Sequence, residues 1–144
     1  MRILALLLLL AWPPVAAAGD KEEGFKEPPK EWATVEIAPF NAKAEAAAGA
    51  AWTRSPLHLA LGLFGDDADA RLLQCEVRRA GGEGGTTTVV LIRDGLLDDS
   101  LRGSWIELEC RRLDDGTWRL AGARSAQRCW RAKDPTKWMA VPCP

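Results

Sequence analysis

The second half of the chain alternates between apolar and polar residues with the two-residue period of β-strands. In Leu72–Arg79, the apolar residues Leu73, Cys75 and Val77 fall on one face, which we expect to be buried in the core. Further strands are predicted at Thr86–Arg93, Ser104–Leu113 and Thr117–Trp130. Glycine-containing turns at 80–85 and 114–116 divide the four strands into two hairpins. Small residues around Gly122 predict a bulge or bend in the last strand.

The first half of the chain carries helical signals instead. Ser55 followed by Pro56 is a typical helix start, because serine caps the first turn and proline suits the first helical position. Large apolar residues then recur at helical spacing up to Phe64, and Gly65 follows as a stop signal. We therefore predict a short core helix here.

Two weaker elements are predicted ahead of this helix. Asn41 is a plausible N-cap for an alanine-rich helix that runs to about Trp52. Trp32–Phe40 is expected to form a short strand or an extended arm.

These elements predict an α+β fold. One or two N-terminal helices would pack on the concave face of a curved antiparallel sheet of about four strands, stabilised by disulfides. We expect a single domain over residues 41–144 and a flexible leader, which could include a short strand, over residues 19–40.

The first 18 residues have the pattern of a secretory signal peptide. Arg2 supplies the positive start, Ile3–Trp12 is apolar, and Ala16–Ala18 offers a small-residue cleavage site. A membrane span needs about 20 apolar residues, whereas this run is shorter and is interrupted by Pro13 and Pro14. We therefore expect cleavage near Ala18, a periplasmic or extracellular location, and no stable membrane span in the mature chain.

The charge of the chain is nearly balanced, with 19 Lys and Arg against 20 Asp and Glu. Nucleic-acid binding is not expected, because it would require a strongly basic domain. Residues 20–45 are acidic and residues 111–137 are basic. We interpret the basic stretch as a solvated strand face, some of whose arginines pair with acidic residues.

All four cysteines lie in the predicted mature chain, and an even number in an exported protein indicates disulfides. The closely spaced ligand pairs of a structural zinc site are missing, so neither a metal nor another cofactor is expected. We predict the bonds Cys75–Cys110 and Cys129–Cys143. The first bond requires neighbouring strands, because an intervening strand would place the two cysteines out of reach. The second would hold the proline-containing C-terminal tail beside the last strand.

The connection between the second and third long strands holds a dense polar cluster. It consists of Asp94, Asp98, Asp99 and Arg102. A functional interpretation is a carboxylate site for a cation or for acid–base catalysis. The favoured interpretation is structural: the carboxylates bond the local backbone, the leucines at 96 and 97 enter the core, and Arg102 pairs with an aspartate.

Tryptophans near the C-terminus are the best candidates for a binding surface. Trp105 and Trp130 are expected on the strand face opposite the core, close to basic residues. The candidate set is Trp105, Arg128, Trp130 and Trp138. An exposed set of this kind would favour binding. Alternatively, the C-terminal tail covers this face with Trp138.

Three blocks of sequence carry a resemblance to a known family. The first combines Trp52–Pro56 with Leu59–Gly65, the second is Arg93–Gly103, and the third places Trp130 and Trp138 between the tail cysteines. They resemble a family of small exported bacterial proteins of unknown function. That family has a Gly-Arg-Gly run after its first tail cysteine, where this chain has Arg131–Asp134. The resemblance implies a Cys129–Cys143 bond but no activity, ligand or catalytic residue.

These features favour a non-enzymatic binding or interaction protein of the cell envelope, with a protein or small ligand as its partner. One alternative is a periplasmic enzyme with a carboxylate site at Asp94, Asp98 and Asp99. Another is an inhibitor-like protein that uses the tryptophan- and arginine-containing tail. No residue is assigned a catalytic role.

Overall fold

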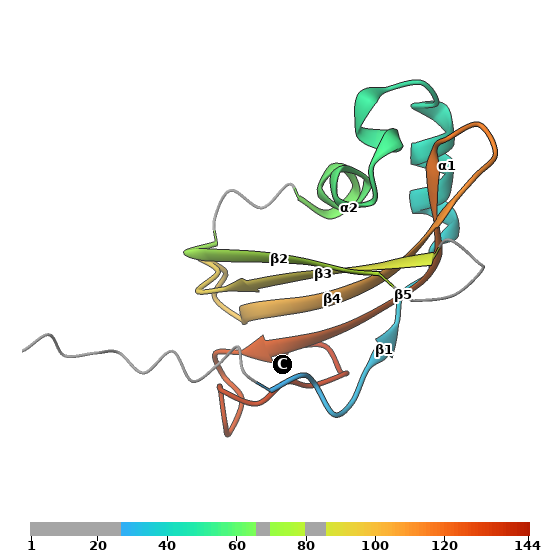
Figure 1. The fold of residues 1–144 in the computed structure, drawn as a ribbon. Coiled ribbons are helices and arrows are strands. Elements are labelled where there is room, and N and C mark those ends of the chain that lie inside the picture. Colours follow the sequence, from blue (N-terminus) through green and yellow to red (C-terminus); the bar gives the residue numbers. More distant parts are fainter. Residues whose placement is uncertain (1–26, 66–69, 80–85) are drawn as a thin grey trace, which may run out of the picture.

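The computed structural model describes residues 27–65, 70–79 and 86–144 of the chain. The predicted signal peptide, residues 19–26 of the predicted leader and the glycine-rich turn at 80–85 lie outside the described residues. The described part has an α+β fold, as predicted, in which helices cover one face of an antiparallel sheet (Figure 1).

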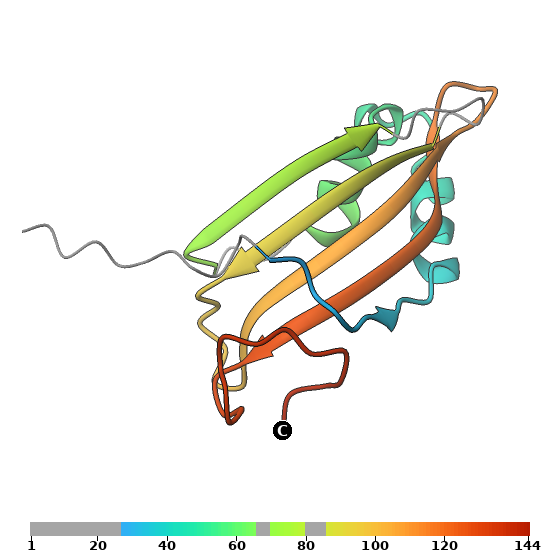
Figure 2. The same cartoon turned by 60° about the horizontal axis from the view of Figure 1, so that its bottom comes forward.

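The sheet has five strands in the order β1-β5-β4-β3-β2. Their bounds are β1 Ala33–Thr34, β2 Leu72–Arg79, β3 Thr86–Asp94, β4 Leu101–Arg112 and β5 Trp118–Cys129. We predicted about four strands; the additional one is β1, which pairs with the outer edge of β5. Figure 2 shows the four long strands side by side, with β2, in green, at one edge of the sheet.

The predicted bulge in the last strand is confirmed. Glu109 of β4 pairs with Gly122, but the next residue, Cys110, pairs with Leu120, so β5 has one extra residue at this point. An extra residue bends a strand and increases its local twist. In Figure 1 the hairpin end of β4 and β5 turns up beside the helices.

The helical segments are α1 Ala38–Ala46, a single 3₁₀ turn η1 at Ala51–Arg54, and α2 Pro56–Phe64. The predicted start of α2 is confirmed, because the Ser55 hydroxyl accepts a hydrogen bond from the His58 N–H and Pro56 is the first helical residue. The alanine-rich segment also forms a helix, but it begins at Ala38 and ends at Ala46, before Trp52.

Asn41 is therefore not the N-cap of α1. Its side chain instead pairs with the backbone of β5: Asn41 Nδ2 donates to the Leu120 carbonyl, and the Leu120 N–H donates to Asn41 Oδ1, both at 2.9 Å. Asn41 thus acts as a one-residue strand partner next to the bulge, and it fixes α1 to the sheet.

Replacing Asn41 with alanine should lower the free energy of unfolding by about 1–3 kcal/mol, because two part-buried backbone groups of Leu120 lose their partners. Asn41→Asp keeps the acceptor but sets a carboxylate oxygen against the Leu120 carbonyl, two acceptors with no proton between them, so it should not restore the stability that alanine loses. Urea denaturation of the three proteins measures the differences. Equal stability of Asn41→Ala and the wild-type protein would contradict this role.

The two faces of the sheet carry two separate hydrophobic cores. The core between helices and sheet includes Leu59 of α2, Leu91 of β3 and Leu108 of β4. A smaller core on the opposite face contains Trp105 and Trp138, with Trp32 packed against it. Figure 1 shows why: the arm before α1 and the C-terminal tail both lie on the side of the sheet away from the helices.

Candidate functional site

The second core contains a continuous row of tryptophans and arginines, which we call the tryptophan stack. The Trp105 ring makes edge-to-face contacts with Trp138, at 5.5 Å between ring centroids, and with Trp32, at 6.3 Å. Arg128 lies over Trp138 and Arg124 over Trp32, each guanidinium carbon 4.2 Å from the ring centroid. Cation–π contacts strengthen as they are desolvated. The stack therefore attaches both the arm and the tail to the sheet.

This arrangement corrects the predicted binding surface. Trp105, Arg128 and Trp138 are all buried, so they do not form an exposed set. The alternative, in which the tail covers this face with Trp138, is the one observed. Burial also lowers the pKa of Arg128, although the nearby Asp94 carboxylate opposes that shift.

Trp130 is the one member of the candidate set that remains exposed. Its side chain is 45% exposed, and the Arg102 guanidinium lies 5.2 Å from its ring centroid. Its backbone N–H donates to the Ser100 carbonyl at 2.8 Å. Trp130 thus contacts the β3–β4 connection rather than the tryptophan stack.

The polar cluster in that connection makes the local contacts that its structural interpretation predicts. Asp98 accepts hydrogen bonds from the backbone N–H groups of Leu101 and Ser100 at 2.6 and 2.7 Å, and these bonds lower the pKa of its carboxyl group. Arg102 pairs with Asp94 at 3.6 Å, as predicted.

The other two carboxylates of the cluster pair with arginines of β5 and the tail as well. Asp94 also lies 4.0 Å from Arg128, and Asp99 pairs with Arg131 at 3.5 Å. Asp98 is bonded mainly to its own backbone, although the charge of Arg131, the partner of Asp99, also acts on it. Of the two leucines predicted to enter the core, Leu96 is buried. Leu97 is 71% exposed, so the prediction is wrong for this residue.

One of the two predicted disulfides is present. Cys129 and Cys143 are bonded, with their Cα atoms 5.4 Å apart. The bonded tail also pairs with β5 through Met139 and Gln127, whose backbone groups exchange two hydrogen bonds of 2.8 Å. The prediction that this bond holds the tail beside the last strand is confirmed.

The predicted Cys75–Cys110 bond is wrong. Cys75 of β2 pairs with Leu91 of β3, and β3 lies between β2 and β4, which carries Cys110. The separation therefore includes two strand spacings, which exceeds disulfide reach. Both thiols are free: Cys75 is exposed, and Cys110 is buried in the first core, where burial raises its pKa to about 12.

The surface that sequence patterning missed is on β2. Leu73, Cys75 and Val77 share one face of this strand, as predicted, but that face is not buried. Leu73 is 47% and Val77 43% exposed, and the Cys75 thiol is exposed between them. We call these three residues the β2 stripe. The described side chains of β2 contribute to neither hydrophobic core.

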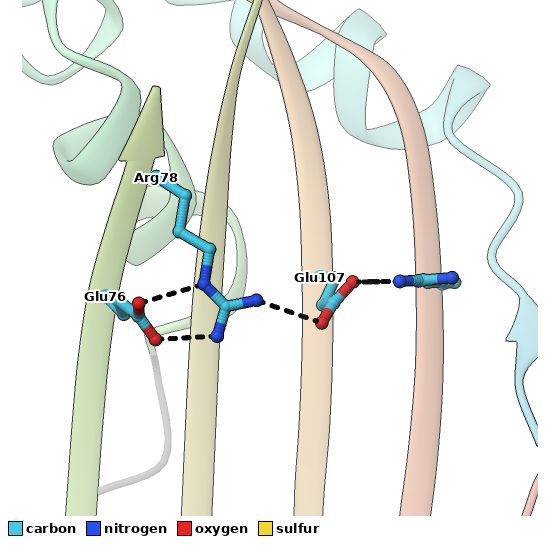
Figure 3. A network of polar contacts seen from close by, with 4 residues as sticks. Glu76, Arg78 and Glu107 are labelled. Atoms are coloured by element: carbon cyan, nitrogen blue, oxygen red, sulfur yellow. Dashed lines mark hydrogen bonds and ion pairs between the residues drawn. The ribbon is translucent and has the colours of Figure 1, made fainter. Parts of the chain in front are cut away.

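The opposite face of β2 is polar except for Leu72 at its start, and its charged side chains bond to each other and to β4. Arg78 makes a two-point ion pair with Glu76 at 2.7–2.9 Å and reaches across β3 to Glu107 at 3.8 Å (Figure 3). Glu107 also accepts a hydrogen bond of 2.8 Å from Arg124 Nε. This row of charged side chains extends from β2 to β5, where Arg124 also contacts the Trp32 ring. β2 therefore has a polar face with internal partners and an apolar face that is open.

Comparisons with known proteins identify no relative of this chain: no family model, no curated protein and no solved structure matches it. Within the described residues, no group of His, Cys, Asp and Glu side chains gathers closely enough to hold a metal ion. The helices of this part of the chain are too short to cross a membrane.

Proposed function

We propose that this protein is an exported, disulfide-stabilised interaction domain that binds a polypeptide partner in the cell envelope through β2. The observation that carries the proposal is the β2 stripe: three apolar residues exposed together on a strand at the edge of the sheet. Burial of such residues normally stabilises a domain, at about 25 cal/mol per Å². Within the described residues no segment buries the stripe, and a partner could supply this stabilisation.

The backbone of β2 supports the same proposal. Among the described strands β2 pairs only with β3, so its outer N–H and C=O groups lie along an open edge. An extended peptide can add to such an edge by backbone hydrogen bonding, while pockets for alternate side chains provide specificity. Leu73 and Val77 would contact the partner on the apolar face.

The polar cluster supports the non-enzymatic part of the proposal. A carboxylate site would require at least two of its acids to face one shared position, with the pKa of one of them raised. In this protein Asp98 is bonded to its own backbone, and the bonds lower its pKa. Asp94 and Asp99 are each paired with arginines.

Export is supported by the sequence of residues 1–18. Expression of the full chain in a bacterial host with an intact export pathway should yield a protein that begins at Gly19. Intact-mass measurement of the periplasmic fraction tests this prediction. Recovery of the uncleaved chain from the cytoplasm would contradict it. In that case the exposed Cys75 thiol would be in the reducing cytoplasm and not in an oxidising compartment.

The binding surface is tested by the double variant Leu73→Asp with Val77→Asp. Neither side chain belongs to a core, so the thermal midpoint should change by only a few degrees. Capture of envelope proteins on the immobilised mature chain, quantified by mass spectrometry, should lose its specific partner in this variant.

Leu97→Asp is the matched control, because Leu97 is an exposed leucine outside β2. It should retain the partner. Equal capture by the wild-type protein and the β2 double variant would contradict the proposed surface.

A further inference from the structure

We propose that the polypeptide bound at β2 is a second copy of this chain, in an antiparallel pair of β2 strands centred on Cys75 and closed by a Cys75–Cys75 disulfide. This inference rests on the proposed function of β2 as an interaction surface. It specifies the partner and the register of pairing.

The β2 stripe is complementary to itself. A two-fold axis perpendicular to the sheet keeps both sets of helices on one face and places equivalent faces next to each other. Centred on Cys75, this axis brings Leu73 opposite Val77 of the partner subunit and Val77 opposite Leu73 of the partner subunit. Residues 72–78 then overlap along their whole length, and every exposed apolar residue of the stripe faces another one. Apolar pairs of this kind stabilise antiparallel strands.

The neighbouring registers match the stripe less well. A pair centred on Glu76 would oppose this carboxylate to Glu76 of the partner subunit, and like charges directly opposite destabilise a sheet. A pair centred on Gln74 would place Val77 opposite Arg71 of the partner subunit. The register centred on Cys75 places Glu76 opposite Gln74 of the partner subunit and keeps both apolar pairs of the stripe. Its less favourable pairs, Leu72 with Arg78 and Arg71 with Arg79, lie only at the two ends of the overlap.

The register centred on Val77 would bring opposite charges together, but these contacts would add little to the stability of the dimer. It would oppose Glu76 to Arg78 of the partner subunit, yet these two side chains already pair within one chain at 2.7 Å. Both are nearly half exposed, and exposed pairs contribute little to stability. This register would also leave Leu73 beyond the end of the partner strand.

The position of Cys75 fits a covalent bond across the axis. Directly opposite residues of an antiparallel pair have Cα atoms about 4.5–5.5 Å apart, which is within the range of about 4.4–6.8 Å for disulfides. Cys75 cannot reach Cys110, because β3 separates their strands. An exposed thiol without an internal partner in an exported protein is typical of intermolecular pairing.

The bond requires an oxidant. Two Cys75 thiols lose two protons and two electrons, and a new S–S bond forms between them. A small-molecule disulfide such as oxidised glutathione accepts the electrons and protons and is cleaved to two thiols. The apolar pairs on either side would hold the two sulfur atoms together and favour the dimer over a mixed disulfide with glutathione.

The test uses the mature chain, Gly19–Pro144, incubated with oxidised glutathione. Non-reducing electrophoresis and light scattering follow dimer formation, and peptide mapping identifies the bond. We expect a dimer with a Cys75–Cys75 peptide. Leu73→Asp should slow its formation at least about tenfold, because a carboxylate placed in an apolar pair costs more than about 1.4 kcal/mol. Leu97→Asp should not slow it, and Cys75→Ser should abolish the covalent dimer.

The inference is overturned if the product is a monomer with glutathione on Cys75, or if Leu73→Asp and the wild-type protein dimerise at the same rate. The proposed function fails separately. If the chain stays monomeric while the β2 double variant loses a captured envelope protein, the second copy is excluded and the β2 surface stands. If neither capture nor dimerisation depends on β2, both proposals fall.

Discussion

Replacing Trp105 with alanine should lower the free energy of unfolding by about 3–5 kcal/mol, the usual cost of removing a buried tryptophan from a core. Trp105 is 3% exposed and touches both Trp32 and Trp138, so its removal leaves the arm and the tail without their shared contact. Single domains are stable by only about 5–15 kcal/mol. The effect should therefore be large in a urea denaturation curve and should lower the thermal midpoint by many degrees.

Trp130→Ala is the matched control, because it removes the same side chain from a position that is 45% exposed. It should cost much less than Trp105→Ala, although it breaks the contact with Arg102. Similar losses in the two variants would show that the second core does not stabilise the fold. In that case the face opposite the helices would have to be reconsidered as a binding surface.

Removing the tail disulfide should be the second most damaging change. The double variant Cys129→Ala with Cys143→Ala opens a loop of sequence separation 14. In the chain-entropy model, a loop of about 15 residues corresponds to about 3 kcal/mol. Because the tail carries Trp138 into the second core, we also expect the tryptophan emission of this variant to shift to longer wavelength. Urea denaturation followed by fluorescence measures both effects.

A double-mutant cycle separates the bond from the packing that it supports. If the disulfide positions Trp138, then Trp138→Ala should cost less in the disulfide-free protein than in the wild-type protein. Cys75→Ala is the control, because its thiol is exposed and contributes to neither core, and it should leave stability unchanged. Additive losses for the bond and for Trp138 would mean that the tail stays in place without the disulfide.

Local chemistry was sufficient to predict the individual elements. The alternation in residues 72–79 is matched by β2, and the serine–proline start at 55–56 is matched by α2. Gly116 has a positive φ of 81° in the hairpin turn, as its position after two aspartates predicted. The bulge near Gly122 and the bonded backbone around Asp98 were also correct. Each of these depends on residues close together in the sequence.

The errors arose where the answer depends on distant neighbours. A two-residue period shows which side chains share a face, but not whether another segment covers that face. Leu73, Cys75 and Val77 have the pattern of a buried face, and they are open only because β2 is at the edge, outside the helix-covered core. The false Cys75–Cys110 bond has the same origin, since it required β2 and β4 to be neighbours.

Asn41 is a further error that arose from a distant contact. A polar residue before an alanine-rich run is a good N-cap candidate, and local propensity favours that assignment. The structure uses the same side-chain amide for a contact 79 positions away in sequence, with the backbone of Leu120 beside the bulge. Nothing local to Asn41 could indicate this partner. A tertiary contact has replaced the local one.

Hydrogen–deuterium exchange across β2 tests the central claim most directly. As an edge strand, β2 has alternate amides that bond β3 and alternate amides that face outward and should exchange rapidly. The mature chain is measured alone at high dilution and again with its partner bound. We predict slower exchange at the outward-facing amides of residues 72–79. Unchanged β2 amides, with protection at residues 97–102 or 130–141 instead, would show that the binding surface lies elsewhere.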